Sequence, residues 1–251
     1  MQPIPVAMNA QAMNALEIYT IPGFREPVSS FTHLLAVPVF LILGWLLVRR
    51  AGNCWTGKIS LSVLVITSVF LLSMSGVYHL LWAGEAKDVL LHLDVAAVFT
   101  LIAGTATPVH VLLFRGVNRW APLVFVWGVS ITGIALRTVL GEGFPPSARA
   151  ALFLGLGWCG LYSCVLLWRR YGFRFVEPLI FGGLAYSVGA LIVIFHWPVI
   201  LPGIIGAHEL WHLAVLVGLG FHWRFVFQFA SAGCHREHPE GWSPLSSLSK
   251  I

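Results

Sequence analysis

Long apolar runs separated by short polar segments dominate the chain between residues 30 and 230. A helix needs roughly 20 apolar residues to cross about 30 Å of hydrocarbon. Lipid cannot satisfy a bare backbone, so runs of this length are expected to be helices. Seven spans are predicted, at about 32–49, 59–83, 89–114, 120–139, 148–168, 177–196 and 206–229. The pattern therefore predicts an all-α integral membrane protein, a bundle of seven transmembrane helices.

The connections between these spans are too short to hold a second domain. We expect a polar N-terminal segment over 1–30, the transmembrane domain over 31–230 and a polar C-terminal tail over 231–251. The first segment lacks the basic start and short apolar core of a cleavable signal peptide, so the first span is expected to drive insertion. Small residues within the spans are expected to let helices pack closely. They include Gly155, Gly157, Gly182 and Gly183.

Composition agrees with a lipid environment. The chain is 58% hydrophobic and only 10% charged, whereas a soluble domain carries about 25% charged residues. Its net charge is +5, and the basic residues cluster between the apolar runs. In that position they can meet anionic headgroups. We therefore expect membrane lipids as partners and no nucleic acid.

The distribution of basic residues predicts an orientation. Arg25, Lys87, Arg137 and Arg149 fall on the N-terminal side of an alternating bundle, and the other 11 of the 15 Lys and Arg fall on the opposite side. Cytoplasmic loops carry the excess of Lys and Arg. We expect a multi-pass protein of the cell membrane with its N-terminus outside and its C-terminus in the cytoplasm.

Polar side chains are costly inside a membrane and mark candidate functional sites. Ser75 and His79 lie four residues apart near the end of the second span, so they share one helix face. Asp94 lies near the start of the third span, and His208 and His212 are again four apart at the start of the seventh. In an alternating bundle these positions converge at one depth. Three histidines with an open fourth position are typical of catalytic zinc.

These residues belong to longer motifs: Ser75-x-x-Tyr78-His79, Leu93-Asp94-x-x-x-x-Phe99 running into Leu101-Ile-Ala-Gly-Thr105-x-Thr-Pro108, and Gly206-x-His208-x-x-x-His212. Together they resemble the haemolysin III family, within the group that includes the adiponectin and progestin receptors, over about residues 25–230. The resemblance implies that His79, His208 and His212 are zinc ligands and that Ser75 and Asp94 are their partners, in the second shell or in catalysis. It also implies a lipid amide hydrolase acting on ceramide-like substrates.

The first span departs from the pattern of that family, which usually shows Glu, then Asn, then His. Glu26 and His33 are present, but Ser29 or Ser30 stands in place of Asn. The role of this polar group stays open. For His33, and likewise for His110, His196 and His222, interfacial hydrogen bonding is the expected role.

Several functions remain compatible with the sequence, and whether the chain is an enzyme stays open. A zinc-dependent lipid hydrolase competes with a receptor-like sensor or membrane-homeostasis protein that holds structural zinc. Cytolysis, implied by the name of the family, would be indirect. His208-Glu209-x-x-His212 also fits the HExxH pattern of zinc proteases, with Glu209 as general base. Against a protease, no Asp-Gly ligand motif follows in a later span, and His79 already offers a third ligand.

Overall fold

The computed structural model describes residues 25–231, and its helices account for the predicted spans. Within this part of the chain lie seven helices long and apolar enough to cross a membrane. They are α2 (Pro27–Arg50), α3 (Trp55–Leu80), α4 (Glu85–Leu113), α5 (Val117–Leu140), α6 (Pro146–Tyr171), α7 (Phe173–Phe195) and α8 (Ala207–Phe227), with a short 3-10 turn η1 (Gly141–Gly143) between α5 and α6. The seven-helix membrane fold is confirmed. The polar segments predicted at 1–30 and 231–251 lie almost wholly outside the described residues.

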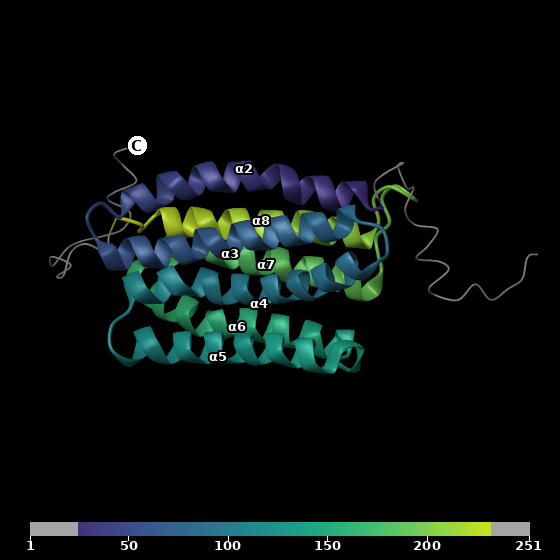
Figure 1. The fold of residues 1–251 in the computed structure, drawn as a ribbon. Helices are drawn as coiled ribbons and strands as arrows, with labels where there is room; N and C mark the ends of the chain where they lie inside the picture. Colours follow the sequence, from purple (N-terminus) through teal and green to yellow (C-terminus); the bar gives the residue numbers. More distant parts are fainter. Residues whose placement is uncertain (1–24, 232–251) are drawn as a thin grey trace, which may run out of the picture.

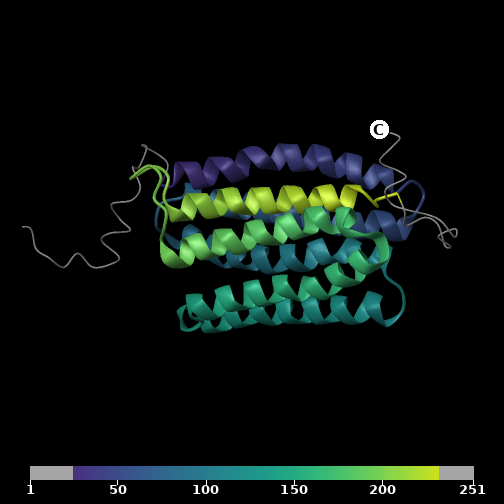
Figure 2. The ribbon, with the colours of Figure 1, turned by 180° about the vertical axis from the view of Figure 1, so that it is seen from behind.

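Successive helices run antiparallel and form one elongated bundle (Figures 1 and 2). Helices α2, α4, α6 and α8 all begin at the same end, which we call the N-terminal end (Figure 1, right). Helix α2 packs against both α3 and α8, whereas α5 and α6 lie on the far side of the bundle. The bundle therefore brings the end of α3 and the starts of α4 and α8 to one level, as the sequence predicts.

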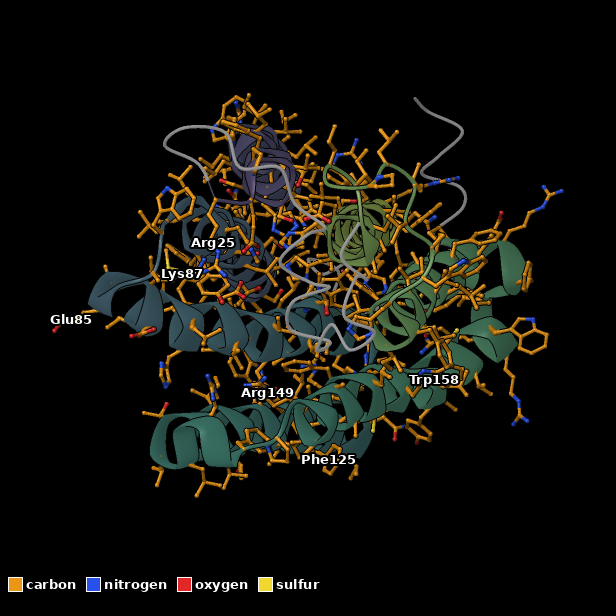
Figure 3. All side chains as sticks on the ribbon, turned by 90° about the vertical axis from the view of Figure 1, so that its right-hand side faces the viewer. Arg25, Glu85, Lys87, Phe125, Arg149 and Trp158 are labelled. Atoms are coloured by element: carbon orange, nitrogen blue, oxygen red, sulfur yellow. The ribbon has the colours of Figure 1, made fainter. Side chains whose placement is uncertain are left out.

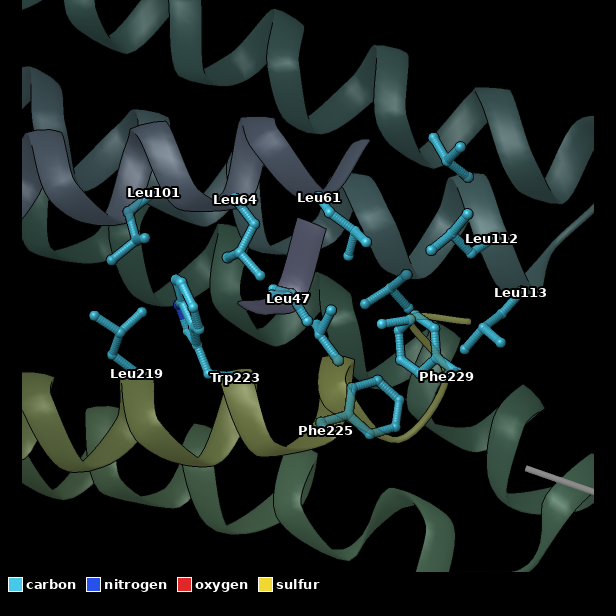
Figure 4. Packing of buried hydrophobic residues seen from close by; sticks show 14 of the residues in the cluster. Leu47, Leu61, Leu64, Leu101, Leu112, Leu113, Leu219, Trp223, Phe225 and Phe229 are labelled. Carbon is cyan, nitrogen blue, oxygen red and sulfur yellow. The ribbon is translucent and has the colours of Figure 1, made fainter. Parts of the chain in front are cut away.

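The largest apolar core is built mainly from α2, α3, α4 and α8, with smaller contributions from α5, α6 and α7 (Figure 4). Leu47, Leu64 and Leu219 are fully buried in it. The Trp223 ring packs edge-on against Phe40, with ring centroids 4.9 Å apart, and its indole N–H donates to Ser68 Oγ at 3.1 Å. A buried indole keeps a hydrogen-bond partner in this way while its ring fills the core.

Glycines do not all serve the packing role expected of them. A Cβ at Gly182 would lie 2.7 Å from His222 Cδ2, so close packing there is real. At Gly155, Gly157 and Gly183, a Cβ would meet nothing within 4 Å. The expectation of close helix approach is wrong at these three positions, because they face open space on α6 and α7 where no helix packs against them.

Candidate metal centre

Three histidines from α3 and α8 meet at the N-terminal end of the bundle. His208 Nε2 lies 3.4 Å from His79 Nε2 and 3.2 Å from His212 Nε2. One ligand atom of each residue lies within 4.8 Å of the others. Zn–N bonds of about 2.0–2.1 Å in a tetrahedron place neighbouring ligand nitrogens about 3.3 Å apart. The predicted convergence is therefore confirmed, and this group could hold a metal ion.

The local structure explains why these nitrogens face one point. His79 lies in the last turn of α3, and His208 and His212 lie one turn apart on one face of α8. His79 and His212 are buried, while His208 is only partly buried. The site thus has two ligands fixed in the packed bundle and one at its more open side.

Glu26 is the nearest charged neighbour of the histidines. Its Oε2 contacts His79 Nδ1, and its backbone N–H donates to the His79 carbonyl at 3.2 Å. Burial alone would raise the pKa of the Glu26 carboxyl, but the hydrogen bond and charge of His79 reverse this and lower the pKa to about 2. The carboxylate is ionised at neutral pH, and by holding Nδ1 it leaves Nε2 of His79 free for a metal.

Basic side chains surround Glu26 at this end of the bundle. Lys87 Nζ lies 3.9 Å from Glu26 Oε1, and Arg25 Nε lies 3.4 Å from the same oxygen. Figure 3, which looks onto the N-terminal end, shows Arg25 and Lys87 close together and Arg149 apart from them. Lys87 also donates to the Leu81 carbonyl at 3.0 Å, which ties the start of α4 to the end of α3.

His33 of α2 completes a cluster of four imidazoles. Its Nδ1 lies 3.2 Å from His212 Nδ1, and the side chain is only 2% exposed. The expectation of an interfacial hydrogen bond is therefore wrong for His33, which is buried beside a candidate ligand. Glu26 and His33 are seven residues apart, or about two helical turns, so their spacing in the sequence indicates that both lie on the same face of a helix. It was missed because the predicted span began at 32 and α2 begins at Pro27.

Glu209 points away from the candidate ligands and binds structural partners. Its Oε1 accepts from Ser29 Oγ at 3.1 Å, and its Oε2 accepts from the Gly206 N–H at 3.0 Å. The second contact satisfies a free N–H at the start of α8. One carboxylate oxygen thus joins α8 to α2, and the other caps α8. Because both oxygens already accept hydrogen bonds, this geometry disfavours Glu209 as a protease-type general base.

Ser75 and Asp94 lie beside each other and beside the histidines. Both residues line the same cavity of about 940 Å³ as the three histidines. The remaining walls come mainly from apolar side chains of α4, α5, α6, α7 and α8. Ligand pockets are commonly of this size, apolar with a few convergent polar groups.

Comparison with known proteins agrees with this arrangement. A family model described as "Haemolysin-III related" matches residues 23–223. The chain belongs to this family. It is 28% identical over 205 residues to a Bacillus subtilis protein named "Hemolysin-3 homolog", covering 77% of this chain and 89% of that one. It is 29% identical over 200 residues to "Hemolysin-3" of Bacillus cereus, covering 77% of this chain and 86% of that one. The region matched to the haemolysin-III-related family contains every candidate site residue from Glu26 to His212.

Proposed function

We propose that this haemolysin-III-related protein is a zinc-dependent hydrolase that cleaves the amide bond of a ceramide-like lipid. The observation that carries the proposal is the shared cavity: three histidines and the Ser75–Asp94 pair line one largely apolar space of about 940 Å³. An apolar cavity suits an acyl chain, and the polar groups at one end suit the amide that the chain carries. Membrane lipids are thus the proposed partners.

The donor set fits zinc. Three imidazoles leave a fourth position open in tetrahedral coordination, as in catalytic rather than structural sites. Glu26 and His33 contact the outer nitrogens of His79 and His212, respectively. Such partners fix the tautomer and orientation of metal-binding imidazoles. Zinc held there would supply a Lewis acid that makes water a stronger nucleophile near neutral pH.

The residues of the chain have separate roles in this proposal. A carboxylate oxygen of Asp94 takes the proton of the water that adds to the amide carbonyl carbon. Asp94 then gives the proton to the amide nitrogen as the C–N bond breaks, which yields a fatty acid and an amine. A serine hydroxyl has one proton to donate. Ser75 lies beside Asp94, so its hydroxyl can orient that carboxylate or stabilise a developing oxyanion, but not both at once.

A second candidate is a membrane sensor or homeostasis protein in which the metal is structural. The observation in its favour is that the three histidines come from α3 and α8, while Glu26 just before α2 and His33 on α2 contact two of them. A metal there would join α3 to α8 directly and α2 through these contacts, whether or not a reaction follows. Cytolysis, suggested by the names of the relatives, would then be indirect, through altered membrane lipids.

The test combines metal analysis with fatty-acid release from a ceramide panel. Wild type and Asp94→Ala should each retain one zinc per chain, and only wild type should release fatty acid. Asp88→Ala, an exposed position on the first turn of α4, is the matched control and should behave as wild type. If both proteins bind zinc and neither releases fatty acid, the structural role replaces the hydrolase.

We also propose that the N-terminal end of the bundle faces the outside, as the distribution of Lys and Arg favours. The histidines would then lie near the outer surface. A C-terminal fusion to a reporter that works only in the cytoplasm should therefore be active. A reporter that is active only outside the cytoplasm would reverse the orientation.

A further inference from the structure

The cavity extends well beyond the histidines and contains buried polar atoms that the metal centre does not use. Among the described residues, Tyr186 Oη and His222 Nδ1 are buried without a hydrogen-bond partner. Both residues line the same cavity as His208 and His212. Buried polar atoms are nearly always paired in folded proteins. A group held in the cavity is therefore the natural partner for these two atoms.

The two rings are held by close packing between α7 and α8. Their centroids lie 5.4 Å apart. A Cβ at Gly182 would come within 2.7 Å of His222 Cδ2, and one at Gly218 would come within 2.8 Å of Tyr186 Cζ. Each ring thus lies against a glycine of the opposite helix, and any larger residue at that glycine would collide with the ring. This packing defines the positions of the two polar atoms.

The hydrogen-bonding character of the pair is also defined. A neutral imidazole has one donor nitrogen and one acceptor nitrogen, so Nδ1 of His222 needs a partner in either tautomer. Tyr186 Oη carries a proton and is a donor. A ligand hydroxyl can both donate and accept, so it can pair with Tyr186 Oη and with either form of His222 Nδ1. A carbonyl can only accept.

The pair lies at a defined depth relative to the metal centre. His222 follows His212 by ten residues on α8, a rise of about 15 Å. Apolar residues such as Val215 and Ile180 line the cavity as well. A long-chain lipid with its reactive group at the histidines would place the middle of its chain beside Tyr186 and His222.

We propose that Tyr186 and His222 form a second binding subsite, which takes a hydroxyl group carried within the chain of a long-chain lipid. Hydroxylated acyl chains are then the preferred class of ligand for this cavity. The inference rests on the proposed function, since it places the reactive end of the lipid at the histidines. It goes further by naming which chains the cavity selects.

The test is direct binding of fatty acids to purified, zinc-loaded, full-length protein. Stearic acid is compared with a series of hydroxystearic acids that differ only in the position of the hydroxyl. One isomer with a mid-chain hydroxyl should bind about tenfold more tightly than stearic acid, as expected for one well-made hydrogen-bonded group. Tyr186→Phe keeps the ring against Gly218 and should abolish this preference, so that the hydroxy acid binds no more tightly than stearic acid. Tyr171→Phe, at a tyrosine outside the cavity lining, should keep it.

Equal binding of all the acids, or a preference that survives Tyr186→Phe, would overturn the inference and leave an ordered water as the partner of the pair. This outcome is separable from failure of the proposed function. A hydroxyl preference that depends on Tyr186, in a protein that cleaves no amide, supports the subsite and removes the hydrolase. Amide cleavage without any hydroxyl preference does the reverse.

Discussion

Two halves of the bundle differ in how tightly their helices pack. In α2, α3 and α4, side chains of neighbouring helices pack directly against the glycines. A Cβ at Gly76 would lie 2.6 Å from Leu34 Cγ, and one at Gly104 would lie 2.0 Å from Thr67 Oγ1. In α6, a Cβ at Gly157 or Gly160 would meet nothing within 4 Å. The same residue type thus marks close helix contact in one half and open space in the other. The metal-centre histidines lie on α3 and α8, and the loosely packed α6 supplies part of the wall of the cavity.

Polar contacts cross between helices in both parts of the bundle. Near the site, Ser30 Oγ donates to the Gly76 carbonyl at 2.8 Å, and Ser29 donates to Glu209. Between α4 and α6, His110 and Ser163 form a hydrogen bond of 3.0 Å. The difference between the two parts therefore lies in how closely the backbones approach. A site that must keep three nitrogens at fixed spacing needs close packing, whereas a cavity for a flexible chain does not.

The largest expected effect is loss of the metal from the histidine site. His208→Ala removes one of three converging nitrogens, and two imidazoles cannot complete a tetrahedral site. We expect the purified variant to contain almost no zinc by elemental analysis. His92→Ala is the control, since His92 bonds to the Asp88 carbonyl of its own helix and should keep its zinc. A fully loaded His208→Ala protein would show that the ligands lie elsewhere.

Next in size is the effect of Glu26. Replacing it with Gln removes the charge that holds His79 Nδ1, and loss of such an outer partner typically weakens metal binding about 10–100-fold. Competition with a chelator at neutral pH measures this directly. Glu85→Gln, exposed at the start of α4, should leave the zinc affinity unchanged. An unchanged affinity in Glu26→Gln as well would mean that the contact does not orient the ligand.

The sequence predicted the fold and the three converging histidines, because both depend on periodicity within single helices and on the alternating direction of successive spans. Long apolar runs defined the spans, and the i, i+4 spacing of His208 and His212 defined a shared face. Contacts between helices were not predictable in the same way. The pairing of Tyr186 with His222 depends on glycines of facing helices that are far apart in sequence. Gly157 was misjudged for the same reason, since one helix alone does not reveal what faces it.

A matched pair of glycine substitutions tests the division between the halves. Gly104→Ala forces a methyl group against Thr67 and should lower the free energy of unfolding by about 2 kcal/mol. Gly157→Ala meets open space and should be neutral or stabilising by up to about 1 kcal/mol, since Ala favours helix over Gly. Denaturation of the purified proteins in the same detergent measures both. Equal losses from the two substitutions would contradict the difference in packing.

The smallest expected effect is that of Glu209, and it decides whether this carboxylate acts in chemistry or in structure. Glu209→Ala leaves the buried Gly206 N–H and Ser29 Oγ without their acceptor. Loss of such a cap should lower the free energy of unfolding by about 1 kcal/mol. Glu209→Gln keeps a side-chain oxygen for one of the two donors, so it should lose less stability and retain zinc and fatty-acid release. Asp94→Asn, compared in the same assay, should retain zinc and lose fatty-acid release. If Glu209→Gln instead stays folded and zinc-loaded but is inactive, Glu209 acts as the base, and the assignment of Asp94 to that role is wrong.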